Sequence, residues 1–403
     1  MWNILGKCGA LLLAASLACL VGLGWLKIAS AQQKSPALLR SPRSTTDSVP
    51  ISLSTPDRIE DRTWWPTAGT PPRSEYVGTA ECAKCHYAKV TAQMKTEMAH
   101  AATRAADPAF LDGQPQLRFR QSPYDYEIGR TGDVVVESVS DGQSSVSQPV
   151  RFAFGQGLVG HTYIYQTEGS LYESHVSYYS DIKGLDVTTG HLQSQFAGLS
   201  QALGRLLEPQ EAQKCFGCHT TASTTSNHFD PSQAMEGVTC EGCHGPGARH
   251  VRSMMAGQIA RGKASIFNPA SLDAGSSVDF CGACHRTSGD VVQLNVRGVV
   301  TVRFQPFRLE ESRCWKSASE RLTCVTCHNP HEPLVQDATD YDHVCLRCHS
   351  GGQPPVNDGQ VVCKISRTNC TGCHMPRVEI PGMHHAFADH RIRITTDKET
   401  YPN

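Results

Sequence analysis

The chain has 403 residues, with 37 lysines and arginines against 38 aspartates and glutamates, and its formal net charge is −1. Hydrophobic residues make up 39% of it and aromatic residues 7%, which is lean for a chain of this length. It has no basic run and no interleaving of basic and aromatic residues, so the composition argues against a nucleic-acid-binding protein.

The first 31 residues have the pattern of a secretory signal peptide. Lys7 supplies a short positive segment, an apolar stretch runs from Cys8 to Leu26, and Ala29-Ser30-Ala31 is a small-x-small cleavage site. We expect cleavage before Gln32. The alternative is a retained anchor, because the apolar stretch approaches the length of a membrane span. In both cases the body is exported, and we expect it in the periplasm or cell envelope of a bacterium.

The remaining sequence predicts a linker followed by one domain. Residues 32–75 are rich in serine, threonine and proline, which is typical of a linker, and the domain is expected over residues 76–403. Short runs of strand-forming residues, separated by glycine-containing turns, predict a small antiparallel β insertion at 109–185. Sustained helical patterns occur at three places, Lys84–Ala105, Leu192–Leu207 and Arg249–Arg261.

The pattern Cys-x-x-Cys-His occurs seven times, whereas chance predicts far less than one copy. Numbered one to seven in chain order, the motifs are Cys82-Ala-Lys-Cys85-His86, Cys215-Phe-Gly-Cys218-His219, Cys240-Glu-Gly-Cys243-His244, Cys281-Gly-Ala-Cys284-His285, Cys324-Val-Thr-Cys327-His328, Cys345-Leu-Arg-Cys348-His349 and Cys370-Thr-Gly-Cys373-His374. Six of them lie in the second half of the chain, so a long gap separates the first motif from the others.

This spacing is typical of covalent haem c attachment. Two thiols three residues apart add to the two vinyl groups of one haem, and the imidazole of the next residue ligates the iron. Structural zinc is a poorer explanation, because a closed tetrahedral site needs two Cys-x-x-Cys pairs and seven is odd. Redox disulfides are also poorer, because such enzymes carry one or two copies. The sequence therefore predicts seven covalently bound haem c groups, whose propionates would make the assembled protein acidic.

A low-spin electron-transfer haem needs a second strong ligand, usually His or Met. The predicted distal ligands are His100, His250, His331, His390 and one of the pair His384 and His385, of which we take His385. His100 follows His86 on a predicted helix, about 21 Å along its axis, and therefore cannot reach the same haem. His250 and His331 are too close in sequence to their own motifs, so each is expected to serve a neighbouring haem. The weaker candidates are His175, His191, His228, His343, His161, Met94, Met98 and Met375.

Several local sequences resemble multihaem cytochromes of the cytochrome c-554 type. They are Tyr76-Val-Gly-Thr-Ala-Glu-Cys-Ala-Lys-Cys-His, Thr239-Cys-Glu-Gly-Cys-His-Gly-Pro-Gly-Ala-Arg-His250, Thr323-Cys-Val-Thr-Cys-His-Asn-Pro-His331 and Cys370-Thr-Gly-Cys-His-Met-Pro with Asp389-His390-Arg-Ile-Arg. The resemblance spans about 76–395 and implies distal ligation by His100, His250, His331 and His390. The wider group includes hydroxylamine oxidoreductase and multihaem nitrite and tetrathionate reductases. This chain differs from those enzymes in its haem count and in having no Cys-x-x-Cys-Lys motif.

The predicted fold class is a mainly α and irregular, haem-organised multihaem cytochrome c with a small antiparallel β insertion. We expect an electron-transfer conduit of the cell envelope, with redox proteins as donor and acceptor, in a membrane-associated complex or haem-protein assembly. One alternative is a reductase or oxidase of a small nitrogen or sulfur compound at one five-coordinate haem. Its candidate lining residues are His161, Tyr163, Tyr165, His175, Tyr178 and Tyr179. A structural subunit of a haem filament is a third alternative.

Two cysteines of the exported body lie outside the motifs. Cys314 precedes motif five and Cys363 precedes motif seven. Paired thiols oxidise outside the cytoplasm, so one prediction is a disulfide between them. The alternative is two free thiols.

Overall fold

The computed structural model describes residues 71–105, 111, 116–155, 157–191, 195–226, 228–318, 322–349, 363 and 365–395. The predicted signal peptide and nearly all of the predicted linker lie outside the described residues. Within the part of the chain that the structure describes, no helix has the length and apolarity needed to cross a membrane.

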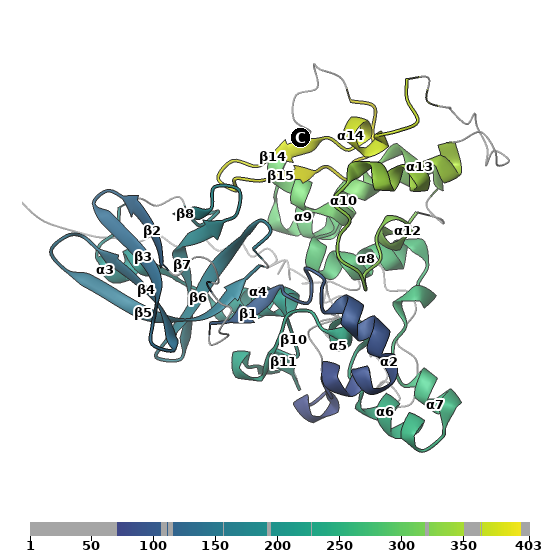
Figure 1. The fold of residues 1–403 in the computed structure, drawn as a ribbon, viewed down its shortest axis with the longest axis horizontal. Coiled ribbons are helices and arrows are strands. Elements are labelled where there is room, and N and C mark those ends of the chain that lie inside the picture. The colour runs from purple at the N-terminus through teal and green to yellow at the C-terminus, as the bar shows by residue number, and fades with distance from the viewer. Residues whose placement is uncertain are drawn as a thin grey trace, which may run out of the picture. The chain divides into compact units, whose positions relative to one another are not determined.

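One antiparallel sheet of nine strands dominates the first half of the described chain (Figure 1). Its order is β2-β3-β4-β5-β6-β7-β8, with β1 paired to β5 and β9 paired to β7. Strand β8 lies against β2, so the sheet nearly closes on itself. The strands are β1 Ala102–Arg104, β2 Gln116–Gln121, β3 Tyr124–Thr131, β4 Val134–Ser140, β5 Ser145–Phe154, β6 Gly160–Thr167, β7 Ser170–Tyr179, β8 Gly184–Val187 and β9 Gly204–Leu206.

The sheet forms where polar and apolar residues alternate. In β3, Tyr124, Tyr126 and Ile128 are buried at every second position, as the two-residue period of a strand requires. The turn between β3 and β4 contains Gly132 with φ +60°, a left-handed conformation that glycine adopts without strain. The strand-like runs predicted from the sequence all lie within strands β2 to β7.

The predicted fold class is nevertheless wrong, because the sheet is neither small nor confined to 109–185. Strand β1 precedes that range and β9 follows it, and both are three residues long. Such short strands carry too little alternation to be recognised in a sequence. Their partners are distant along the chain, as in Ala102 opposite Phe154 and Tyr172 opposite Leu206, so tertiary pairing decides them.

Two predicted helices are also shorter than expected. The pattern over Lys84–Ala105 forms α2 only as far as Gln93, and the chain then turns and enters β1. His100 therefore lies beyond the helix, and its predicted axial distance from His86 does not apply. The pattern over Leu192–Leu207 forms helix α3 only at Leu199–Leu203, after which β9 joins the sheet through β7.

Outside the nine-stranded sheet, the described chain consists mostly of short helices and three two-stranded sheets. The helices are α2 Thr79–Gln93, α3 Leu199–Leu203, α4 Pro209–His219, α5 Cys240–His244, α6 Ala248–Met255, α7 Ile259–Ala264, α8 Ala274–His285, α9 Ser288–Leu294, α10 Gln305–Glu310, α11 Arg313–Ala318, α12 Cys324–Cys327, α13 Asp342–His349 and α14 Cys370–His374. The small sheets pair β10 Thr220–Thr221 with β13 Met235–Glu236, β11 Thr224–Thr225 with β12 His228–Phe229, and β14 Arg377–Glu379 with β15 Ala386–Ala388.

Buried apolar side chains are concentrated in and against the nine-stranded sheet. Two of the three apolar clusters in the described chain lie there, and the third is a small group around Val302. The sheet holds motif two in place through Phe216, a fully buried residue between the two cysteines of that motif. Its ring meets those of Phe152 and Phe154 edge to face, each with ring centroids 5.0 Å apart.

Candidate haem sites

All seven Cys-x-x-Cys-His motifs lie on helices, and the helical period explains why. Residues i, i+3 and i+4 share one face of a helix, so the two cysteines and the histidine of a motif point the same way. The motif histidine is the last residue of α4, α5, α8, α13 and α14, and it caps α12. Each of these motifs can therefore present two thiols and one imidazole to a single planar group.

Three motif histidines each face the ring of a second histidine from a distant part of the chain. His86 of motif one faces His250, with ring centroids 6.3 Å apart. The corresponding distance is 6.0 Å between His244 of motif three and His331. An iron bound by two imidazoles at bond lengths of about 2 Å separates the ring centroids by about 6 Å. The centroid spacing of these pairs therefore matches that of two histidines bound to one iron.

The third pair has the same spacing and connects motif five to the end of the described chain. His328 faces His390, with ring centroids 6.2 Å apart. In all three pairs the second histidine comes from outside the motif that it faces. This is the chain-crossed arrangement that ligation between neighbouring haems requires.

Motifs one and three are held together by a buried carboxylate. Glu241 lies between the two cysteines of motif three and is 2% exposed. It accepts hydrogen bonds from the backbone N–H groups of Val77, Gly78 and Gly247, at 2.9, 2.8 and 2.7 Å. The first two donors lie directly before helix α2, which carries motif one. As a result, a thiol of each motif contacts a thiol of the other.

Contacts between cysteines of different motifs continue through the helical region. They join Cys82 to Cys240, Cys218 to Cys284, Cys281 to Cys324, and Cys345 to Cys370. Cys243 of motif three lies close enough to the two cysteines of motif four for their charges to raise its pKa. The guanidinium of Arg347 in motif six donates to the carbonyl of Thr326 in motif five at 3.0 Å. The motifs thus form one connected series, one-three-four-five-six-seven, with motif two joined at motif four.

Comparisons with known proteins point to the same chemistry. A family model described as cytochrome c554 and c-prime matches residues 173–245, which include motifs two and three. Multiheme cytochrome MtrA of Shewanella baltica (strain OS185) is 24% identical over 183 residues, which are 42% of this chain and 46% of that protein. The chain is a multihaem c-type cytochrome. The class predicted from the motifs is therefore confirmed, and the cytochrome carries covalently bound haem.

The chain spans about half the length of MtrA, the curated relative that it matches. A solved structure, that of the outer cell wall cytochrome OcwA, covers 79% of this cytochrome and 80% of its own chain, at 14% identity and a TM-score of 0.45.

Hydrogen bonds from Nδ1 orient several of these histidines. Nδ1 of His244 donates to the carbonyl of Phe267 at 2.8 Å, and Nδ1 of His250 donates to that of Gly262 at 2.9 Å. A carbonyl oxygen can only accept, so Nδ1 carries the proton and Nε2 keeps its lone pair for a metal. Further motif histidines of this kind are His219, bonded to Ala101, and His374, bonded to Arg393.

Burial keeps several of these imidazoles neutral. It lowers the pKa of His219, His285 and His328, and it lowers the pKa of His390 to about 4. The neutral form is the one that binds iron. A neutral imidazole next to two cysteine thiols fits a haem-binding histidine.

The structure gives other partners to several histidines that the sequence offered as ligands. Nε2 of His100 donates to the carbonyl of Met94 at 2.8 Å, and His385 bonds Asp181 at 2.9 Å. His384, His191 and His175 bond Asp186, Glu173 and Gln121 respectively. Among the residues that the structure describes, none of these five rings stacks on a motif histidine. Distal ligation by His100 and His385 stays a prediction.

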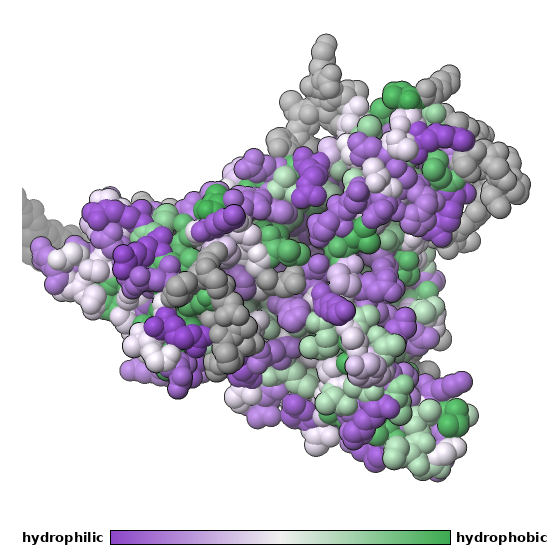
Figure 2. Space-filling view, viewed as in Figure 1, coloured by the Kyte–Doolittle hydropathy of each residue, from purple (hydrophilic) through white to green (hydrophobic). Residues whose placement is uncertain are grey.

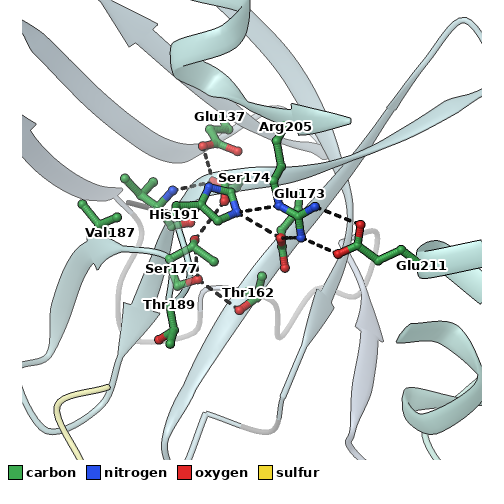
Figure 3. A network of polar contacts seen from close by, with 12 residues as sticks. Glu137, Thr162, Glu173, Ser174, Ser177, Val187, Thr189, His191, Arg205 and Glu211 are labelled. Atoms are coloured by element: carbon green, nitrogen blue, oxygen red, sulfur yellow. Dashed lines mark hydrogen bonds and ion pairs between the residues drawn. The ribbon is translucent and has the colours of Figure 1, made fainter. Parts of the chain in front are cut away.

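His191 belongs to a polar network that ties the sheet to motif two (Figure 3). Its Nε2 lies 2.9 Å from the carboxylate of Glu173 on β7. Arg205 on β9 bonds the same carboxylate and donates to both oxygens of Glu211 on α4, at 2.9 and 2.6 Å. Because α4 ends in motif two, this network and the cluster around Phe216 together fix that motif against the sheet.

The predicted disulfide between Cys314 and Cys363 is absent, because both thiols are free in the structure. Cys363 is exposed. Cys314 lies on α11 beside the cysteines of motif six, and burial raises its pKa. The two cysteines are therefore separate features of the cytochrome.

The sequence reasoning missed two arginines of the site, Arg308 and Arg303. The carboxylate of Asp389 is completely buried, and Arg308 and Arg393 bind it. Arg303 contacts the sulfur of Met383 at 3.5 Å and the ring of Phe387 at 5.5 Å. Among the described residues it has no carboxylate partner. Arg308 and Arg303 occur in no recognisable motif, whereas Asp389 and Arg393 lie in the segment around the predicted ligand His390.

Proposed function

We propose that the cytochrome is a seven-haem electron-transfer conduit of the bacterial cell envelope. The observation that carries this proposal is the connected series of contacts between cysteines of different motifs. Electron transfer between redox groups requires that they lie close together, and these contacts bring neighbouring attachment sites into direct contact. The export signal predicted from the sequence supports the location.

In this proposal the fourteen motif cysteines attach the haems, and the seven motif histidines are the proximal ligands. His250, His331 and His390 are distal ligands opposite motifs one, three and five, because their rings face those motif histidines at the required spacing. Haem iron supplies the reversible one-electron chemistry, and its reduction potential depends on the ligands, burial and nearby charge. Redox proteins are the proposed donor and acceptor.

The number of haems is tested by mass. The intact mature protein should exceed the mass of its polypeptide, counted from Gln32, by seven haems. A fully matured protein with six haems or fewer would contradict the assignment of all seven motifs.

The conduit is tested by placing an electron at one end of the series and detecting it at the other. Cys363 is exposed and precedes motif seven, so a ruthenium photoreductant can be coupled to its thiol. In the variant His250→Met, the haem of motif one gains a sulfur ligand and a distinct absorption band. After a flash, the absorbance of that band should change as the haem of motif one is reduced. The rate of this change should not depend on protein concentration, because the electron moves within one molecule.

The variant that also carries Cys363→Ser should give no response, because Cys314, the other thiol outside the motifs, is only partly exposed. A response that scales with protein concentration in the labelled protein would mean exchange between molecules. That result would refute the conduit.

One observation favours a second function, reduction or oxidation of a small nitrogen or sulfur compound. His219 and His285, of motifs two and four, face no second histidine ring among the described residues, and Arg303 lies close to both. A guanidinium that has no carboxylate partner attracts an anion. Turnover of nitrite, hydroxylamine or tetrathionate that is lost in Arg303→Met would establish this function. The absence of turnover in the unaltered protein would exclude it for these compounds.

A further inference from the structure

The segment from Gly242 to Leu272 is basic, in contrast to the rest of the cytochrome. It contains Arg249, Arg252, Arg261 and Lys263 and no aspartate or glutamate, whereas the whole chain has a formal net charge of −1. Each haem brings two propionates, so this segment is a basic stretch of a protein that is acidic as a whole.

Helices α6 and α7 pack against each other within this segment and place its three arginines around one hollow. The hollow has a volume of about 180 Å³ and is lined by Arg249, Arg252, Ser253, Gln258 and Arg261. Arg252 is 3.4 Å from Glu75, a long and exposed ion pair. Among the described residues, Arg249 and Arg261 have no carboxylate partner. The hollow therefore presents donors to a carboxylate that the described chain does not supply.

The same surface also exposes apolar side chains. Met255 is 81% exposed and Ile259 is 49% exposed, at the end of α6 and the start of α7. Figure 2 shows hydrophilic and hydrophobic residues mixed over this region, at the lower right of the view. Arginine and methionine surrounded by polar groups are the composition of a protein–protein interface.

This surface lies directly beside the histidine pair of motif one. His250 is part of α6, and its Nδ1 donates to the carbonyl of Gly262 on α7. Its ring faces His86, which is exposed together with Cys85. A partner seated on α6 and α7 would thus rest at one end of the connected series of motifs.

We propose that α6 and α7 form the docking surface for an acidic redox protein that exchanges electrons at motif one. The proposal rests on the conduit function and names the partner class at one of its ends. Carboxylates of the partner would pair with Arg249 and Arg261, and Met255 would supply apolar contact. A protein is favoured over a lipid surface, because the two helices have eight and six residues and form no extended amphipathic face.

The test uses two probe proteins of opposite charge with the holoprotein. Photoreduced flavodoxin is the acidic donor and mitochondrial cytochrome c is the basic acceptor. The variant Arg249→Glu/Arg261→Glu reverses the charge of the hollow. We expect its bimolecular rate constant with flavodoxin to fall by about tenfold or more at low ionic strength, because the attraction between opposite charges is lost. The dependence of this rate constant on salt concentration should largely disappear for the same reason. Its rate constant with cytochrome c should rise.

The matched control is Arg118→Glu/Arg120→Glu, which changes the net charge equally on strand β2. These side chains are 69% and 68% exposed, and they pair with Glu127 and Asp125. The control should change the flavodoxin rate constant far less. Equal slowing by both variants would show an effect of net charge alone and would overturn the proposal.

Two further outcomes would also overturn it. A changed spectrum of the motif-one haem, with unchanged salt dependence, would mean that the arginines bind a propionate of the protein's own haem. Binding to phosphatidylglycerol vesicles that is lost in the variant, with an unchanged flavodoxin rate constant, would mean a membrane surface. Failure of the conduit is distinguishable from these outcomes. In that case the electron injected at Cys363 does not reach the haem of motif one, either in the unaltered protein or in the charge-reversed variant.

Discussion

Substitution of Asp389 by asparagine should destabilise the cytochrome and disturb one haem. Its carboxylate is completely buried and accepts two hydrogen bonds from Arg308, at 2.8 and 2.7 Å, and one from Arg393 at 2.7 Å. Burial acts to raise the pKa of Asp389, but these contacts outweigh burial and hold it below its ordinary value. The charge of Arg308, which is 2% exposed, depends on this carboxylate for compensation.

Removing one partner of a buried ion pair costs about 3–5 kcal/mol, because the other charge stays buried and unpaired. We expect a loss of this size in the free energy of unfolding for Asp389→Asn. The substitution should also move the next residue, His390, whose ring faces His328 at 6.2 Å. Urea denaturation followed by circular dichroism measures the first effect. Electron paramagnetic resonance should show one additional high-spin haem.

The control is Asp125→Asn, which removes an exposed carboxylate 3.0 Å from Arg120. Exposed pairs contribute about 0–1 kcal/mol, so little change is expected. If Asp389→Asn costs no more than this control, the buried pair does not stabilise the fold as argued. If it destabilises the protein but leaves every haem low-spin, Asp389 does not position His390.

Three further substitutions test other parts of the structure. Burial raises the pKa of Glu137 to about 8, so the native state keeps a proton that the unfolded chain loses above its ordinary pKa of 4.5. The free energy of unfolding should therefore fall between pH 4.5 and 8, by up to about 1.4 kcal/mol per pH unit, and urea titrations of Glu137→Gln should lack this slope. His250→Ala should produce one high-spin haem by electron paramagnetic resonance, and a fully low-spin spectrum would exclude His250 as a ligand. Gly237 has φ +67°, and Gly237→Ala places a Cβ against the carbonyl of Ala99. Its melting temperature should therefore fall further than that of Gly132→Ala, whose added Cβ has no neighbour within 4 Å. Equal shifts in melting temperature would refute the close approach.

Local patterns in the sequence determined the chemistry of this protein. The spacing of each Cys-x-x-Cys-His motif lies within one helical turn, so no distant contact is needed to recognise it. Strands β2 to β7 were predictable for the same reason, since alternation such as that of Tyr124, Tyr126 and Ile128 is a local signal. The expected helix that continued past Gln93 failed because pairing of β1 with β5, far along the chain, outweighs local helical preference.

The tertiary structure alone decided which histidine faces which motif. His250 lies six residues after His244, yet its ring faces His86, because Glu241 holds the start of α2 against motif three. Nothing in a sequence records such a pairing, since an imidazole has the same chemistry wherever it lies and only packing selects its partner. The same holds for Asp389 and Arg308, whose mutual compensation arises only once both are buried together.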